Sequence, residues 1–303
     1  MKSNSLNRRQ FLSRTAVAAG AAAFTPLTGA LRAAKGDPGA VDQVPLGKTG
    51  LKISRLGFGT GTIGGSVQRR LGHEAFNRLI RYAYDRGVTY IDTAQNYHTH
   101  EWVRQAVRGL PREKLYIQSK IPGNPPKALD VIDRYRKELD TDYIDSLLIH
   151  VATRPDWDKE RARAIEAALE AKQRKWVRAV GVSCHSLPAL KLAVDLDWVQ
   201  VHLVRINPFG SHMDTPTPRW NAPSDSSHVP AVVEQIKRMH QKGRGVIGMK
   251  LVGEGSFKDP AQRKKAIEFV LGLGTVNAMV IGFKAPSEID EAIRNIRGAL
   301  KAA

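Results

Sequence analysis

Short apolar runs alternate with longer amphipathic stretches along this chain from Val44 onward. The apolar runs fall at 55–60, 89–94, 115–120, 144–150, 178–184, 198–206, 245–250 and 278–283. Between them apolar residues recur with helical spacing, most clearly over 73–87, 160–175 and 227–243. Apolar runs of this length predict buried strands, and the periodic stretches predict helices that cover them.

Eight strands that alternate with helices predict an α/β fold of the (β/α)8 barrel type. A hairpin is expected ahead of the barrel, around "VPLGKTGLKIS" at 44–54. The competing architecture is a doubly wound open sheet, which usually carries a glycine-rich nucleotide fingerprint after its first strand. The stretch "GFGTGTIGG" at 57–65 has glycines at the wrong spacing and no immediate helix, so it is a weak signal for such a loop.

The amino terminus departs from this alternation. It reads "SLNRRQFLSRTAVAAGAAAFTPLTGALRAA", in which Arg8 and Arg9 precede Phe11, Leu12 and a weakly apolar Ala/Gly run. This pattern is typical of a twin-arginine export signal, and Pro26 with the Ala/Gly content makes a poor bilayer span. A disordered or helical tail is the alternative interpretation.

The export signal predicts the organisation of the chain and its destination. We expect a signal peptide over 1–34, a linker over 35–43 and a single barrel domain over 44–303. The twin-arginine translocase would be a transient partner, and the protein would be periplasmic or otherwise exported. This translocase carries folded proteins, so the signal favours a tightly held cofactor.

Charge and cysteine usage narrow the function. The chain has 47 Lys and Arg against 29 Asp and Glu, a formal charge of +18, but the basic residues are dispersed among acids. No dense basic tract with interleaved aromatics is present, so a nucleic-acid partner is not expected. The single cysteine, Cys184, excludes an intramolecular disulfide and an iron–sulfur cluster held by several cysteines.

Four groups able to ionise or to donate protons stand at the ends of successive predicted strands. Asp92 ends the second strand, Tyr97 follows in its loop, and Lys120 and His150 end the third and fourth strands. The carboxyl ends of parallel barrel strands form one face, so these side chains should converge. Each alone has an ordinary structural role, such as a cap or a solvated strand end, but their joint occurrence indicates a catalytic site.

The chemistry of such a group follows from elementary electrostatics. A buried lysine beside an aspartate is paired, and its positive charge should lower the pKa of a neighbouring phenol from about 10. A tyrosine tuned in this way can donate a proton near neutral pH. The sequence therefore predicts that Lys120 lowers the pKa of Tyr97.

The chain resembles the aldo/keto reductases in the segments that carry these residues. "DTAQNY", "SK" at 119–120 and "IDSLLIH" are similar to the three catalytic segments of that family, in the right order, and the similarity runs from about Val44 to Ile296. The resemblance implies that Tyr97 is the general acid and Lys120 depresses its pKa. It further implies that Asp92 holds Lys120, that His150 orients a small carbonyl substrate, and that a nicotinamide cofactor delivers hydride. No catalytic metal is expected.

The resemblance also implies contacts for the cofactor. Ser183 matches the serine that binds the nicotinamide carboxamide, although Cys184 stands where the family usually has asparagine. Gln200 or Leu203 would match the carboxamide-binding glutamine. Met249 or Lys250 stands near the place of the stacking aromatic, which is not evident here.

At the adenosine end, "VIGFKAPSEIDEAI" at 280–293 resembles the nucleotide-gripping segment of the family. By that resemblance Gly282 and Lys284 lie near the phosphate and Glu291 near the adenine. Glu288 stands where many NADP-selective members have arginine, and its carboxylate would repel a 2′-phosphate. NADP (as NADPH) is expected on family grounds, with NAD possible.

Two other functions compete with a reductase. One is a metal-dependent hydrolase on the same barrel, with His98, His100, His150 and His185 as ligands and Lys120 as a carbamate. The other is a non-catalytic barrel that acts as a binding module. The long segment 207–229, rich in Pro and Ser, is either a lid over the pocket or a surface excursion.

Overall fold

A computed structural model describes residues 39–302 of this chain. The predicted export signal over 1–34 lies outside these residues. Within them the structure is a closed barrel of parallel strands in the order β10-β3-β4-β5-β6-β7-β8-β9, preceded by a separate two-stranded hairpin of β1 and β2. The predicted barrel and the amino-terminal hairpin are therefore confirmed.

The strands and helices follow one another in the predicted alternation, with bounds that differ from the predictions by a few residues. The strands are β1 (Gln43–Pro45), β2 (Lys52–Ser54), β3 (Leu56–Gly59), β4 (Tyr90–Asp92), β5 (Tyr116–Pro122), β6 (Ile144–Ala152), β7 (Val177–Cys184), β8 (Val201–Arg205), β9 (Gly245–Met249) and β10 (Ala278–Gly282). The α-helices are α2 (Ser66–Arg69), α3 (His73–Asp85), α4 (His100–Val107), α5 (Ala128–Leu139), α6 (Trp157–Glu160), α7 (Ala162–Gln173), α8 (Leu187–Asp195), α9 (Val229–Gln241), α10 (Pro260–Gly272) and α11 (Pro286–Ala302). Short 3₁₀ turns are η1 (Gln95–Tyr97), η2 (Arg112–Lys114), η3 (Ser226–His228) and η4 (Gly253–Gly255).

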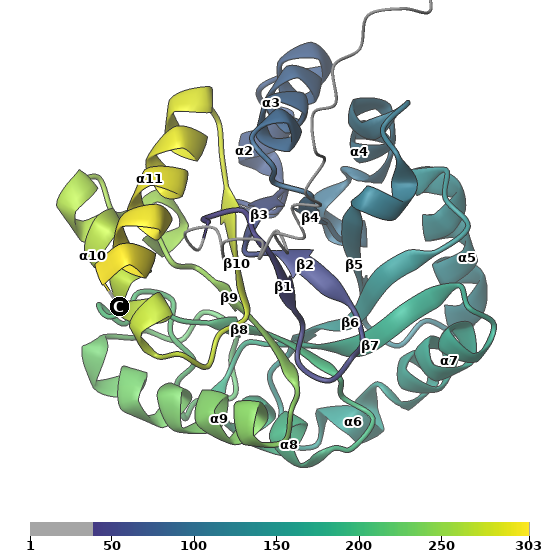
Figure 1. Cartoon of the computed structure of the whole chain (residues 1–303). Helices are drawn as coiled ribbons and strands as arrows, with labels where there is room; N and C mark the ends of the chain where they lie inside the picture. The colour runs from purple at the N-terminus through teal and green to yellow at the C-terminus, as the bar shows by residue number, and fades with distance from the viewer. Residues whose placement is uncertain (1–38, 303) are drawn as a thin grey trace, which may run out of the picture. The chain divides into compact units, whose positions relative to one another are not determined.

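Two apolar clusters hold the barrel together. The larger lies between the strands and the surrounding helices, which Figure 1 shows outside the ring of strands. The smaller fills the barrel interior and includes Leu46, Leu51 and Ile53 from the hairpin region. The hairpin turn at Gly47 packs against the backbone of Gly245 at the start of β9, where a Cβ on Gly47 would lie only 2.5 Å from the Gly245 nitrogen. The hairpin therefore closes the amino-terminal end of the barrel and leaves the carboxyl-terminal end for the site.

Parallel pairing fixes which strand ends are neighbours at that face. β10 closes the barrel by pairing with β3, with Gly282 opposite Gly59. β6 pairs with β7 in a register that sets His150 opposite Ser183. Within the described part of the chain, no helix is long and apolar enough to cross a membrane.

Candidate active site

The structure brings Asp92 and Lys120 together as a buried ion pair at the carboxyl end of the barrel. Asp92 ends β4, Lys120 lies in β5, and Lys120 Nζ donates to Asp92 Oδ1 at 2.6 Å. The same ammonium donates to the carbonyl of Thr93 at 3.0 Å. Both side chains are almost fully buried, so each charge depends on the other for stabilisation.

Tyr97 lies over this pair because η1 turns the chain back toward the barrel mouth after β4. Its hydroxyl is 3.4 Å from Lys120 Nζ and 3.5 Å from His150 Nε2. The ring packs against Gly61 in the loop after β3, where a Cβ would lie 2.4 Å from the phenol carbons. Glycine at this position is therefore required for the ring to lie where it does.

A second layer of side chains supports the pair from inside the barrel. Gln118 Nε2 donates to Asp92 Oδ1 at 2.7 Å and to the Tyr90 hydroxyl at 2.9 Å, while its Oε1 accepts from Ser146 at 2.9 Å. Gln118 was not among the predicted site residues. Its signal was available, because a glutamine inside an apolar strand two residues before Lys120 must satisfy its amide within the barrel.

The electrostatics of the phenol differ from the prediction. Burial raises the pKa of Tyr97 well above its usual value, and the negative charges of Asp92 and Glu254 add to the rise. Burial also lowers the pKa of the Lys120 ammonium, against the opposing effect of Asp92. The predicted lowering of the Tyr97 pKa is therefore wrong for this structure, because Asp92 neutralises the lysine and burial disfavours phenolate.

His150 is a neutral imidazole at the same face. Burial lowers its pKa well below the usual value, and the positive charges of Lys120 and Arg161 lower it further. Its Nδ1 is buried without a hydrogen-bond partner, while Nε2 faces the Tyr97 hydroxyl. Asp92, Tyr97, Lys120 and His150, called the tetrad below, thus surround one point. Within it, Nδ1 of His150 still lacks a hydrogen-bond partner.

A further polar group lies beside the tetrad, from the ends of β7 and β8. Ser183 Oγ is 3.2 Å from His185 Nε2, and Arg205 Nη2 contacts His185 Nδ1. Cys184 points the other way and is buried in the cluster between strands and helices. His185 entered the sequence analysis only as a possible metal ligand and Arg205 was missed, although a lone arginine near the end of an apolar run is the same signal that identified Lys120.

Gln200 is not part of this face, so its prediction as a cofactor contact is wrong. It stands just before the amino end of β8, where its Oε1 accepts from Lys172 Nζ at 2.5 Å and from the Val180 amide at 3.3 Å. The apolar run 198–206 begins three residues before β8 does, so the run alone does not show which of its residues lie in the strand. Leu203 pairs with Ser183 and packs inside the barrel.

The segment after β8 lies against the site. Arg205 Nη2 donates to the Trp220 carbonyl at 2.8 Å, and the Trp220 ring stacks on His185 with centroids 5.9 Å apart. His185 in turn lies 6.5 Å from the His150 ring. The interpretation of 207–229 as a cover over the pocket is therefore favoured over a surface excursion.

A hydrogen bond joins two loops across the carboxyl end of β10. Glu254, in the loop after β9, accepts from the backbone amide of Ile63 in the loop after β3 at 3.0 Å and pairs with Lys250 Nζ at 2.6 Å. Since β9 and β3 flank β10, the link passes over the strand that ends at Gly282. The loop after β3 also covers Gly282, where a Cβ would lie 2.0 Å from Thr62 Oγ1.

Charges at the predicted adenosine end are paired within the protein. The backbone amide of Lys284 donates to Glu288 Oε2 at 2.8 Å, at the start of α11, and Lys284 Nζ is 4.0 Å from Glu288 Oε1. Glu291 accepts from both Nε and Nη2 of Arg263, at 2.6 and 2.8 Å. The cofactor contacts of Gly282, Lys284 and Glu291 stay predictions.

The histidines proposed for a hydrolase do not gather around one point. His100 turns away from the mouth, with Nε2 2.8 Å from Ser119 Oγ and Nδ1 2.6 Å from Glu138. Lys120 is engaged with Asp92. Between residues 39 and 302, no three His, Cys, Asp or Glu side chains are grouped as metal ligands would be, so the geometry gives this alternative no support.

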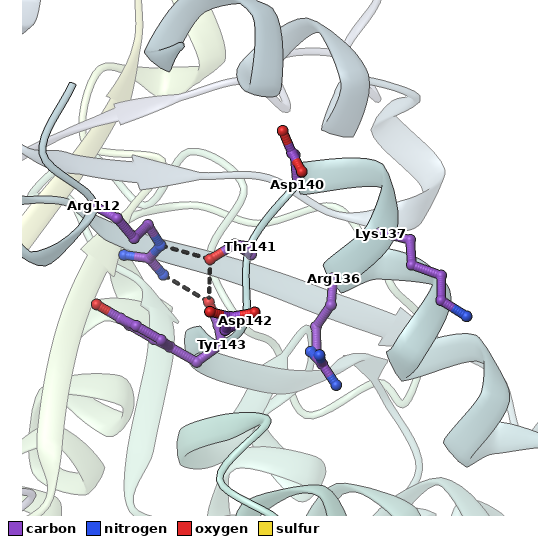
Figure 2. Close-up of a pocket in the computed structure, with 7 residues that line it drawn as sticks. All are labelled: Arg112, Arg136, Lys137, Asp140, Thr141, Asp142 and Tyr143. Carbon is purple, nitrogen blue, oxygen red and sulfur yellow. Dashed lines mark hydrogen bonds between the residues drawn. The ribbon is translucent and has the colours of Figure 1, made fainter. Parts of the chain in front are cut away.

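A hollow at the opposite end of the barrel belongs to the scaffold. Figure 2 shows the residues that line it, around the turn that leads from α5 into β6. Its volume is about 460 Å³. Arg112 donates to Thr141 Oγ1 and to the Tyr143 carbonyl, both at 2.8 Å. Arg112 and Arg178 also hold the fully buried Asp145, each at 2.8 Å. These contacts hold the amino ends of β6 and β7 together. No tetrad residue is among the residues that line the hollow.

The fold and site together define a barrel protein whose strand ends hold a phenol, an ammonium, a carboxylate and an imidazole around one point. The sequence profile of the aldo/keto reductase family matches residues 55–270. The chain belongs to the aldo/keto reductase family.

Curated relatives align over part of the chain. Methylglyoxal reductase DkgB of Salmonella typhi is 30% identical over 160 residues, which are 50% of this chain and 57% of that protein. A probable aldo-keto reductase 1 of Glycine max is 31% identical over 125 residues, 36% of each chain. The chain thus spans between about a third and somewhat over half of the length of these relatives.

Solved structures match the fold over most of the chain. A putative aldo-keto reductase from Pseudomonas aeruginosa superposes with a TM-score of 0.69 at 22% identity, covering 86% of this chain and 97% of that one. A holo-form aldo-keto reductase from Bacillus halodurans gives 0.66 at 17% identity, covering 86% and 96%. At these identities the likeness concerns the fold alone.

Proposed function

We propose that this protein is an oxidoreductase that reduces an aldehyde or ketone to an alcohol, with a nicotinamide nucleotide as cofactor. The observation that carries the proposal is the position of the Tyr97 hydroxyl, 3.4 Å from Lys120 Nζ and 3.5 Å from His150 Nε2. A carbonyl oxygen bound there would meet a proton donor, a cation and an imidazole at once. Those are the groups that stabilise a developing alkoxide.

Each tetrad residue has a separate task in this proposal. Tyr97 gives its proton to the carbonyl oxygen, and its raised pKa keeps the phenol protonated until that oxygen becomes basic. His150 stays neutral and orients the carbonyl through Nε2. Lys120 supplies positive charge beside the phenol, and Asp92 holds Lys120 in place.

The residues at the mouth fit a nicotinamide. Ser183 presents a buried hydroxyl in register with His150, where it could bind a carboxamide beside the tetrad. When bound, the nucleotide supplies the hydride. The family resemblance favours NADP, whereas the carboxylate of Glu288 beside Lys284 favours NAD. We propose NADP, with NAD as the alternative that Glu288 makes testable.

The names of the relatives suggest probes for the substrate. Among them are methylglyoxal reductases and a 2,5-diketo-D-gluconic acid reductase B, so small dicarbonyl compounds are the first class to try. One relative, from Escherichia coli, is described as NADH-specific, which is a reason to assay both nucleotides. We propose a small carbonyl compound as substrate.

The test is turnover by the purified barrel with methylglyoxal or a small aromatic aldehyde, followed by nucleotide absorbance. Binding of NADPH and NADH is measured separately by fluorescence. Turnover that depends on Tyr97 supports the proposal. Nucleotide binding without turnover of any carbonyl probe would favour a binding module, and absence of nucleotide binding would refute the proposal.

We further propose that the chain is exported through the twin-arginine route. The support is the sequence pattern around Arg8 and Arg9. An exported reductase has no evident supply of fresh nucleotide, so this proposal is compatible with the first only if the nucleotide is retained by the folded protein. Ultraviolet absorbance of the protein purified from the periplasm tests both statements together.

A further inference from the structure

A chain of three polar side chains runs along the barrel mouth next to the tetrad. Arg205 at the end of β8, His185 just after β7 and Ser183 near the end of β7 are 3%, 6% and 1% exposed. Arg205 Nη2 contacts His185 Nδ1, and His185 Nε2 lies 3.2 Å from Ser183 Oγ. None of these contacts is needed by the tetrad itself.

The direction of hydrogen bonding along this chain follows from the first residue. A guanidinium only donates, so His185 Nδ1 must accept from Arg205. Burial and the charge of Arg205 lower the pKa of His185 well below its usual value, so the ring is neutral. A neutral ring that accepts at Nδ1 carries its proton on Nε2 and donates it to Ser183 Oγ. The Ser183 hydroxyl proton is then free to donate elsewhere.

The surroundings hold the chain in this geometry. The Arg205 guanidinium also donates to the Trp220 carbonyl and faces the fully buried Asp214, whose Oδ1 is 3.6 Å from Arg205 Nε. Trp220 stacks on His185 and covers it. An imidazole clamped between a guanidinium, an indole and a serine has one orientation available.

We propose that Arg205 and His185 are positioning residues that fix Ser183 as a hydrogen-bond donor, so that this corner of the mouth binds a carbonyl oxygen. The inference rests on the proposed function, in which that oxygen belongs to the nicotinamide carboxamide or to the substrate. Ser183 stands opposite His150 in the strand register, so either source brings the ligand beside the tetrad.

The first experiment reads the tautomer of His185 in the full barrel by long-range proton–nitrogen spectra of ¹⁵N-labelled protein. We expect an unprotonated Nδ1 and a protonated Nε2. Arg205→Met should abolish this single tautomer, while the signals of His202, a buried histidine elsewhere on β8, should not change. Because Arg205→Met leaves Asp214 unpaired, the double variant with Asp214→Asn is measured as well.

The second experiment measures NADPH and NADH affinity by fluorescence, without substrate. Ser183→Ala and His185→Leu should each weaken binding about fivefold to tenfold, the worth of one hydrogen bond. His185→Gln should bind within about threefold of wild type, because its amide can accept from Arg205 and donate to Ser183. If affinity is unchanged but KM for the carbonyl rises by the same factor, the oxygen is the substrate's.

Three results would overturn the proposal. They are a protonated Nδ1 in the wild type, an unchanged tautomer in both Arg205 variants, or a His185→Leu protein with wild-type affinity and KM. If the wild type bound no nicotinamide nucleotide, the proposed function would fail, while the tautomer measurement would still decide whether Arg205 sets the proton on His185.

Discussion

Lys120 Nζ and Asp92 Oδ1 are 2.6 Å apart, and their side chains are 0% and 7% exposed. The ammonium therefore has its counter-ion before any ligand binds. Besides Asp92 and the Thr93 carbonyl, the remaining polar group near it is the Tyr97 hydroxyl, at 3.4 Å. This pair links the stability of the barrel mouth to the chemistry proposed for it.

Replacing the phenol tests the proton donor directly. Tyr97→Phe should keep the fold and the nucleotide affinity but lower kcat for carbonyl reduction by about two to four powers of ten, the usual contribution of a general acid. Steady-state kinetics with a small aromatic aldehyde measure the loss. Wild-type turnover by this variant would show that Tyr97 is not the donor.

Breaking the buried pair should cost stability as well as rate. Lys120→Met leaves Asp92 charged and unpaired, so the free energy of unfolding should fall by about 3–5 kcal/mol and the rate should fall nearly as far as in Tyr97→Phe. Asp92→Asn should have a milder effect on rate. The double variant should regain part of the lost stability because no lone charge remains, and denaturant unfolding of all four proteins measures this coupling. Additive losses would contradict a paired site.

The acidity of Tyr97 in the ligand-free protein can be measured by phenolate absorbance. Because burial raises its pKa, the phenol should stay protonated past the ordinary value of about 10 and ionise only as the pH rises through the higher value. The proposed reduction needs the protonated form, so the donor would be present at every lower pH. A difference titration of wild type against Tyr97→Phe should therefore show no phenolate from this residue below about pH 10. A transition near pH 8 would restore the sequence-based expectation.

Nucleotide choice should respond to the charge at position 288. Glu288→Gln keeps a side-chain acceptor for the Lys284 amide but removes the negative charge, so NADPH affinity should rise about twofold to fivefold with little change for NADH. Lys284→Ala should weaken NADPH by about 1–3 kcal/mol. The exposed Glu234 on α9 offers a matched control as Glu234→Gln. Equal effects on both nucleotides would mean that a 2′-phosphate is not bound there.

Export should depend on the arginine pair itself. Replacing Arg8 and Arg9 together by lysine keeps the charge, yet folded and active protein should accumulate in the cytoplasm. Immunoblots of periplasmic and cytoplasmic fractions measure the distribution. An unchanged periplasmic yield would exclude the twin-arginine route.

Periodicity was sufficient for the fold because each barrel strand is buried on both faces and reads as a short apolar run. The convergence of these side chains could also be predicted, because Lys120 and His150 interrupt such runs where a charge or an imidazole has no packing role. Their catalytic role stays a prediction. The prediction for Gln200 was wrong because the apolar run 198–206 does not show where β8 begins. The strand begins at Val201, so Gln200 lies one residue before it.

The rest depends on contacts that sequence does not display. Burial and the charges of Asp92 and Glu254 raise the pKa of Tyr97, and Glu254 comes from a loop more than 150 positions away. The partnership of Arg205 with His185 likewise depends on the turn after β7, since the two residues lie on different strand ends. The sequence shows an arginine at position 205, but it does not show that the side chain of Arg205 contacts His185.

The hydrogen bond between Glu254 and the Ile63 amide bears on how readily a bound nucleotide would leave the carboxyl-terminal end of the barrel. A bond to a charged acceptor is worth about 1.5–3 kcal/mol, so this bond by itself would make the intervals in which the two loops are apart roughly ten to a hundred times rarer. Any nucleotide seated beneath them would leave only during those intervals, and its residence would lengthen by the same factor. If the chain is exported as proposed, to a compartment without a nucleotide pool, that contact would raise the number of turnovers one molecule completes before its cofactor is lost.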